Sequence, residues 1–246
     1  MKDSALNNLS DSKVLSIENP FECSIVERIN RFVVKIQVES KYSRAHINNT
    51  GRLKEFLIKS RKAFCFKKGK LVRTDCRLFA IEEQGSGALI DTQLQMKAFE
   101  NSIKSGLIPW LKECTIIRRN ARLGISYIDY LLECKGKEVF LEVKSAVLRE
   151  GKYAMYPDCP STRGQRHIKD LAYYVRKGGK GIILFMAALP EVEAFKPNKS
   201  ADPELFNLLK EAHFSGVEIR ALGLYYNPAD SYVYLYNPDL KIELNS

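Results

Sequence analysis

The sequence predicts an α/β (α+β) protein in which a small N-terminal β-barrel is followed by a C-terminal mixed-sheet domain. Short segments with the period-two alternation of strands follow one another through the first third of the chain. After Gly85-Ser86-Gly87 the period changes, and helix-length amphipathic segments alternate with short apolar ones. Two adjacent strand-like segments in this second part carry charged side chains among apolar ones.

The first part of the chain is expected to form the barrel over residues 18–85, after a polar and poorly ordered stretch at 1–17. Strand-like alternation runs from Phe21 to Glu39 and is clearest over residues 32–38. Further strands are expected at 42–47, 53–58, 62–66, 70–73 and 77–83, with turns at 48–51 and 67–70. Five or so short strands within about 65 residues are typical of a small barrel of the OB type.

The second part, residues 86–246, is expected to be one α/β domain. Helices are predicted at 91–105, 162–177 and 203–214, the last with Asp202 as its N-cap and Pro203 at its first position. Strands are predicted at 114–118, 181–187, 217–225 and 232–236. This order indicates a mixed sheet with helices packed on it, and the sequence holds no internal repeat.

The chemistry is predicted to lie on a hairpin in the second part, where residues 125–134 and 138–144 are separated by Lys135-Gly136-Lys137. Glu142 and Lys144 share one strand face because side chains two apart point the same way. Asp129 stands mid-strand among apolar neighbours, where a lone carboxylate is costly unless a cation pairs with it. The pattern D-x12-E-V-K is that of the PD-(D/E)xK nucleases and predicts a Mg²⁺ or Mn²⁺ site. The alternative is an exposed Asp129 and a solvated Glu–Lys pair.

The net charge of +10 is concentrated in one segment. Twelve Lys and Arg lie between Lys41 and Arg77, against only Glu55 and Asp75, so this segment accounts for the whole excess. Four aromatic residues are interleaved with these charges: Tyr42, Phe56, Phe64 and Phe66. Cations that meet phosphates and rings that stack on bases favour a nucleic-acid surface. A generic basic surface and an anionic-membrane patch are the alternatives, and the lack of an amphipathic helix here disfavours the second.

Composition and targeting signals exclude several other classes of protein. No apolar run approaches the roughly 18 residues of a membrane span, and the polar start of the sequence has no apolar core of a secretory signal. The six cysteines are scattered without zinc-finger spacing, which predicts free or buried thiols in a cytoplasmic protein.

The chain resembles the sugar fermentation stimulation protein A (SfsA) family from about residue 20 to 225. Five stretches carry the resemblance: RFVVKIQ (31–37), HINNTGRLKEFL (46–57), the YIDYLLE…LEVKSAVL block (127–148), YPDCPSTRGQRHIKDL (156–171) and GIILFMA (181–187). The sequence departs from the family pattern at supporting positions: Asn48 replaces a proline, Tyr127 an arginine and Val147 a threonine, and a helix asparagine falls at Met96.

The resemblance implies an N-terminal OB-like domain and a C-terminal PD-(D/E)xK nuclease-like domain in a DNA-binding protein. Asp129 and Glu142 would hold the metal with the Val143 carbonyl, and Lys144 would orient a water or stabilise charge. Asp158 is a further candidate ligand by resemblance, with capping of the 162–177 helix as its alternative. Glu100 could add a ligand only if its helix faces the hairpin.

Candidate DNA contacts come from both parts of the chain and are His46, Arg52, Arg61, Lys62, Lys67, Lys68, Arg122, Arg163 and Gln165. Arg166 and Lys169 are interpreted as solvated helix positions. His167, next to apolar helix neighbours, is interpreted as structural.

Two functional hypotheses follow. The first is a metal-dependent phosphodiesterase, a hydrolase acting on DNA. The second is a non-catalytic DNA-binding regulator of sugar metabolism that carries an idle site. The strandedness of the DNA, the choice of DNA over RNA and the oligomeric state stay open.

Overall fold

Five strands near the N-terminus close into a barrel in the computed structural model of the chain, which describes residues 11–67 and 74–244. Neighbouring strands are antiparallel except for one parallel pair, β4 with β6, which closes the ring in the order β2-β3-β4-β6-β5. The five strands are β2 (Pro20–Asn30), β3 (Val33–Val38), β4 (Lys41–His46), β5 (Lys62–Phe66) and β6 (Cys76–Glu83). Alternate side chains of β3 fill the interior, because Val34 and Ile36 are fully buried while their neighbours are not.

The rest of the chain builds a mixed sheet whose central strands are parallel. The order β15-β13-β10-β9-β8 runs from the barrel side to the free edge. Its strands are β8 (Cys114–Leu123), β9 (Ser126–Cys134), β10 (Lys137–Ser145), β13 (Lys180–Ala187) and β15 (Glu218–Asn227). The near-continuous burial of β13 is expected for a parallel strand covered on both faces.

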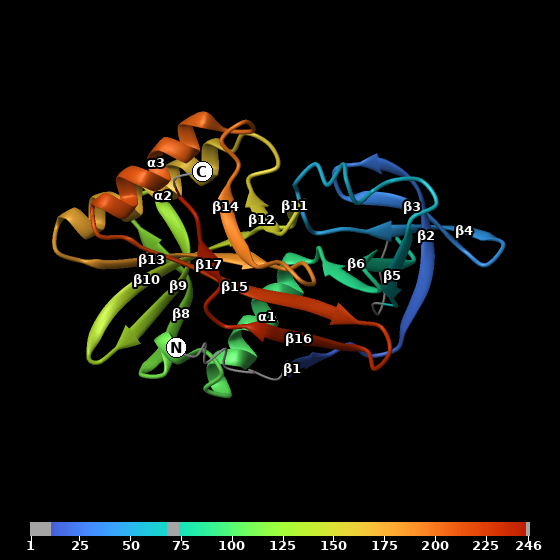
Figure 1. Cartoon of the computed structure of the whole chain (residues 1–246), viewed down its shortest axis with the longest axis horizontal. Helices are drawn as coiled ribbons and strands as arrows, with labels where there is room; N and C mark the ends of the chain where they lie inside the picture. The colour runs from blue at the N-terminus through green and yellow to red at the C-terminus, as the bar shows by residue number, and fades with distance from the viewer. Residues whose placement is uncertain (1–10, 68–73, 245–246) are drawn as a thin grey trace, which may run out of the picture.

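Helices cover both faces of this sheet (Figure 1). The helices α2 (Thr162–Arg176) and α3 (Pro203–Phe214) lie side by side on one face, where Tyr174 of α2 packs on Phe140 of β10. Helix α1 (Thr92–Lys104) packs on the other face, where its Phe99 contacts Tyr130 of β9. A 3₁₀ turn, η1 (Pro109–Leu111), follows α1.

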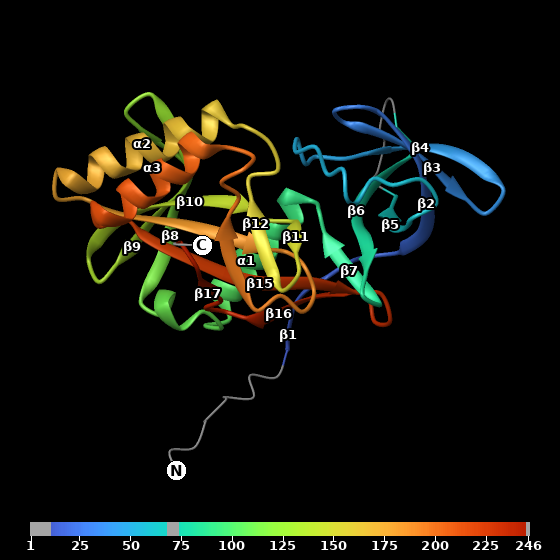
Figure 2. The same cartoon turned by 45° about the horizontal axis from the view of Figure 1, so that its top comes forward.

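A second, four-stranded sheet lies beside the interface with the barrel (Figure 2). Its strands follow the order β11 (Leu148–Glu150), β12 (Tyr153–Tyr156), β14 (Ala194–Pro197) and β17 (Lys241–Ile242). The loop after β12 leads directly into α2. This sheet therefore positions residues 156–161 between the two parts of the molecule.

The barrel and the C-terminal sheet are joined by hydrogen-bonded strands. The strand β7 (Ser86–Leu89) pairs with β6 on one side and with β15 on the other. Gly87 permits this junction, because a Cβ there would lie 2.9 Å from the Tyr226 ring. On the opposite side β1 (Ser12–Ser16) pairs with β16 (Tyr232–Asn237), which extends the sheet from β15. The segment expected to separate two domains, residues 85–87, is thus part of a hairpin.

Most predicted elements are present, two expectations were wrong, and one stays untested. Residues 53–58 form turns because their buried side chains, Leu53 and Phe56, are three apart, which suits a turn and not a strand. Residues 12–16 are ordered as β1 because Val14 and Leu15 are buried. The strand predicted at 70–73 lies outside the described residues.

The cysteine prediction needs one correction. Cys114 and Cys134 form a disulfide, although they are separated by 20 residues in the sequence. The antiparallel register of β8 and β9 places them directly opposite each other, with their Cα atoms 4.2 Å apart. The other cysteines are free, and three of these are buried. No helix in the described part of the chain is long and apolar enough to cross a membrane.

Candidate active site

The two carboxylates of the predicted motif meet where β9 and β10 separate. The ladder between these strands pairs Tyr130 with Leu141 and then ends. At the next position the Asp129 side chain replaces the backbone as hydrogen-bond acceptor. Its Oδ2 accepts a hydrogen bond of 2.8 Å from the backbone N–H of Val143. Asp129 is therefore held against the backbone of β10, beside Glu142.

Glu142 is buried, with 2% of its surface exposed. Its Oε1 accepts hydrogen bonds from two side chains, the Lys144 ammonium on the same strand and His167 on α2, whose Nδ1 lies 2.6 Å away. Its Oε2 has no hydrogen-bond partner among the residues that the structure describes. A buried carboxylate oxygen without a partner is rare and calls for an explanation.

Burial and charge act in opposite directions on the two carboxylates. Burial, together with the charge of Glu142, raises the pKa of Asp129 from 3.8 to about 6. Burial also disfavours the charged form of Glu142, but the Lys144 charge and the His167 hydrogen bond outweigh it and lower the pKa of this carboxyl. Burial likewise opposes the charged form of Lys144, and the Glu142 charge overcomes it and raises the pKa of this amine. Lys144 is thus held as an ammonium.

Glu100 meets the condition set for it, because α1 packs on the hairpin. Its Oε1 accepts a 2.8 Å hydrogen bond from the Tyr130 hydroxyl, and its Oε2 pairs with Arg119. Glu100 and Asp129 line one cavity of about 690 Å³. Both oxygens of Glu100 nevertheless have protein partners, whereas Oε2 of Glu142 has none among the described residues.

Asp158 lies at the interface with the barrel. Its Oδ2 accepts a 3.0 Å hydrogen bond from the backbone N–H of Leu53, and the cap of α2 is Ser161. Among residues 11–67 and 74–244, no group of three Asp, Glu, His or Cys side chains is arranged to hold a metal. The structure therefore brings together Asp129, Glu142 and Lys144, while Asp158 shares only a cavity lining with Lys144.

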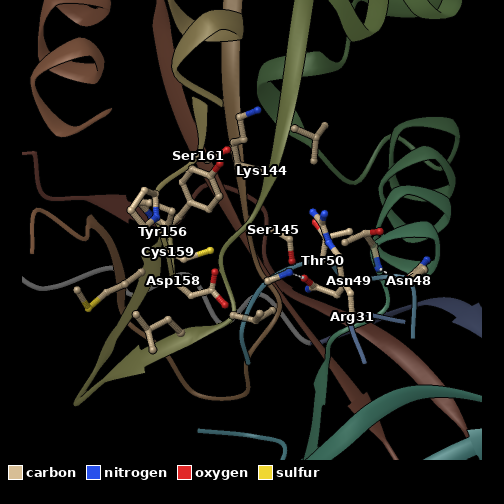
Figure 3. Close-up of a pocket in the computed structure, with 18 residues that line it drawn as sticks. Arg31, Asn48, Asn49, Thr50, Lys144, Ser145, Tyr156, Asp158, Cys159 and Ser161 are labelled. Atoms are coloured by element: carbon tan, nitrogen blue, oxygen red, sulfur yellow. Dashed lines mark hydrogen bonds between the residues drawn. The ribbon is translucent and has the colours of Figure 1, made fainter. Parts of the chain in front are cut away.

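A polar cavity of about 300 Å³ opens between the two parts of the molecule (Figure 3). The barrel contributes the turn residue Arg31 and the loop 48–51, and the C-terminal part contributes Val143 to Ser145 and residues 155–161. Lys144 belongs to this cavity and to the ion pair with Glu142 at once. The cavity is therefore continuous with the carboxylate site.

The predicted DNA contacts fall into different environments. Four of them are exposed on the surface: Arg52, Lys67, Arg122 and Arg163. Lys62 is exposed and pairs with Glu22 at 2.6 Å, and His46 stacks on Phe32. Two others are engaged inside the fold. The Arg61 guanidinium binds Glu83 and two backbone carbonyls, and Gln165 donates to Asp202, the N-cap of α3. Lys68 lies outside the described residues.

Sequence reasoning missed the barrel residues that complete the interface. Asn48 donates to Asp91, the N-cap of α1, and accepts from the N–H of Thr92. Arg77 binds Asp91 from the barrel strand β6. These contacts cross the domain interface, so neither periodicity nor motif spacing could reveal them.

Comparisons with known proteins match both parts of the chain. A family model described as "Sugar fermentation stimulation protein RE domain" matches residues 93–230, and one described as "SfsA N-terminal OB domain" matches residues 26–90. The chain is 50% identical over 222 residues to a sugar fermentation stimulation protein homolog of Pyrococcus furiosus, covering 90% of this chain and 96% of the relative. It is 45% identical over 232 residues to the homolog of Archaeoglobus fulgidus, covering 94% and 99%.

A solved structure shares the fold. The structure of Pyrococcus furiosus SfsA in complex with Ca²⁺ superimposes with a TM-score of 0.91 at 47% identity, covering 94% of this chain and 99% of that one. The predicted order of an OB-like barrel followed by a mixed-sheet α/β domain is confirmed.

Proposed function

The chain belongs to the sugar fermentation stimulation protein family, and from that premise we propose that it is a DNA-binding protein that hydrolyses phosphodiester bonds with Mg²⁺ or Mn²⁺. The observation that carries this proposal is Glu142 Oε2, a buried carboxylate oxygen with no partner among the described residues, next to the half-buried carboxylate of Asp129. A divalent cation would supply the missing partner and offset the repulsion between Asp129 and Glu142.

The donor set fits a hard divalent cation. Asp129, Glu142 and the Val143 carbonyl would hold it, and all three offer oxygen atoms, which Mg²⁺, Mn²⁺ and Ca²⁺ prefer. The Ca²⁺ complex of the Pyrococcus furiosus protein supports a cation of this class. Asp158 would join the set only through its Oδ1 or by releasing the Leu53 N–H from its Oδ2.

The cation and the Lys144 side chain would have different roles in hydrolysis. A bound cation lowers the pKa of a water and polarises a phosphate oxygen. Lys144 stabilises negative charge and does not act as a base, because its raised pKa keeps the amine protonated. The Glu142 carboxylate pairs with Lys144 and favours its ammonium form. The position of Lys144 between the carboxylates and the cavity suits stabilisation of a phosphate that carries growing negative charge.

The outer face of β3 and β4 would bind the DNA strand. Antiparallel register places Lys35 opposite Arg44, and Tyr42 and His46 follow on the same face of β4. Tyr42 is 65% exposed, and the Lys35 ammonium lies 4.9 Å from its ring centre. Exposed rings with cations beside them bind single strands by stacking and phosphate contacts, and this face of OB barrels is suited to that role.

Cleavage of labelled DNA tests the proposal. Single-stranded and duplex DNA are incubated with Mg²⁺, Mn²⁺ or EDTA, and products are separated by size. Glu142→Gln and Lys144→Met are expected to reduce cleavage by about 100-fold or more, as removal of a charge stabiliser does. The matched controls Glu138→Gln and Lys137→Met, exposed on the same strand, should cleave like wild type.

The second candidate function is that of a non-catalytic DNA-binding protein that regulates sugar metabolism. The observation in its favour is the engagement of both Glu100 oxygens, which leaves two acidic side chains at the site. Wild-type protein that binds DNA and cleaves none with any cation would establish this candidate in place of the first.

A further inference from the structure

We propose that the cavity between the barrel and the C-terminal part holds one unpaired nucleotide, so that the substrate class is single-stranded DNA or the single-stranded end of a duplex. The inference rests on the proposed DNA function and narrows it. Its basis is the size, the lining and the position of the cavity.

Size excludes a duplex. At about 300 Å³ the cavity is at the lower end of the range for sites that hold one small molecule, and a base pair with its two backbones does not fit there. Enzymes that act on a nucleotide within a snug site take it out of the stack or use a strand that is already single. A free strand reaches this cavity without that cost.

The lining suits the two halves of a nucleotide. Val147, Leu148, Met155 and Pro160 give an apolar wall for a base. Arg31 and Lys144 bring positive charge for a phosphate from the barrel side and the strand side. Figure 3 shows Lys144 and the Tyr156 hydroxyl together at one end, and Asn48, Asn49 and Arg31 on another side. The hydroxyls of Thr50, Ser145 and Ser161 also line the cavity and can donate hydrogen bonds to a base edge.

Position connects the cavity to the surface and to the carboxylates. Arg31 lines the cavity, and the next residue, Phe32, is 46% exposed and stacks on His46 of the β4 face. At the other end Lys144 contacts Glu142. A strand bound on the β3–β4 face thus enters the cavity past Arg31 and presents its backbone to Lys144. A protein that binds duplex DNA on a flat surface would not need this route from the β3–β4 face into the cavity.

Binding measured in EDTA tests the inference apart from cleavage. The probes are a fluorescent oligothymidylate, a blunt duplex of the same length and free thymidine monophosphate. Thr50 is exposed and lines the cavity, so Thr50→Trp fills it without disturbing the core. Thr115→Trp, exposed on β8, is the matched control, and Arg31→Ala is paired with Arg176→Ala on α2.

We expect Thr50→Trp and Arg31→Ala to weaken oligothymidylate binding by about tenfold and duplex binding by less than about twofold, with the controls unchanged. Equal losses for both DNA forms, or no loss, would overturn the inference. Tight binding of thymidine monophosphate without oligothymidylate binding would overturn it too, since the cavity would then serve a free nucleotide. Cleavage with Mn²⁺ is measured separately, so a catalytic protein that prefers duplex DNA refutes only this inference.

Discussion

His167 Nδ1 lies 2.6 Å from Glu142 Oε1, and both side chains are 3% exposed. Arg163 Nε lies 3.4 Å from the other ring nitrogen, Nε2. A guanidinium can only donate, so Nε2 accepts and Nδ1 carries the proton that is donated to Glu142. The histidine interpreted from the sequence as structural thus orients the carboxylate proposed to hold a cation.

The first prediction concerns this hydrogen bond. His167→Leu removes the donor and is expected to weaken Ca²⁺ binding by about 10- to 100-fold, the usual effect of losing a group that orients a ligand. His167→Asn keeps a donor near the Nδ1 position and should recover most of the affinity. Calorimetric Ca²⁺ titration of both folded variants measures this. Equal affinities for the two variants would mean that packing, and not the hydrogen bond, matters.

The second prediction concerns pH. Asp129 binds its proton up to about pH 6 in the folded protein, so Ca²⁺ affinity should fall by roughly tenfold per pH unit below that value and level off above it. The folded state also holds this proton more tightly than the unfolded chain does. The contribution of Asp129 to the stability of the metal-free protein should therefore decrease as pH rises from 3.8 to about 6.

Asp129→Asn is the control for this pH effect. The variant lacks the titrating carboxyl, and its stability should decrease less over the same window than that of wild type. Urea unfolding at several pH values measures the difference. The same pH slope in both proteins would assign the effect to other groups.

The third prediction concerns the buried ion pair between the two parts of the molecule. Arg77 Nη2 lies 2.6 Å from Asp91 Oδ1, and the residues are 5% and 1% exposed. Arg77→Met leaves Asp91 buried without its cation, which should lower the free energy of unfolding by about 3–5 kcal/mol. Lys169→Met breaks the exposed pair with Glu204 and should cost less than about 1 kcal/mol in the same urea experiment. Similar costs would contradict the prediction.

The fourth prediction concerns the barrel surface. Lys35 and Arg44 lie opposite each other on the outer face of β3 and β4, and their joint replacement by Gln should weaken DNA binding and reduce the slope of log affinity against log salt by about two. Lys112→Gln with Lys177→Gln changes the net charge equally on the other part of the molecule. If both double variants change the slope alike, long-range charge and not this surface determines binding. Arg61 is unsuitable for such a test because its contacts are internal.

The sequence predicted those parts of the fold in which local pattern and burial agree. Asp202 was recognised as the N-cap of α3 because its position before Pro203 is a local signal, and it accepts the Leu205 N–H. The shared face of Glu142 and Lys144 followed from strand period alone. By contrast β1, β7 and β12 are short, and each pairs with a strand far away in the chain: β16, β15 and β14 respectively. Local pattern carries little information about such pairing.

The candidate site shows the same division. Charge counting identified the basic segment, but it treated twelve cations alike. Arg61 and Arg77 are held by carboxylates of β6 and the α1 cap, so they stabilise the fold instead of covering its surface. The opposite error concerned Arg31, which lies outside the basic segment and lines the interdomain cavity. Only the folded chain places a turn of the barrel beside Lys144.

The strand β7 has a consequence for how this protein can be divided. Cutting the chain near residue 85 would separate β6 from β7 and leave one edge of each strand without its partner. Open edges of this kind recruit other chains, so each fragment should aggregate or require its complement in the same solution. We therefore expect the two parts to unfold together in a single thermal transition. The strand β7 couples them because it is hydrogen-bonded to both.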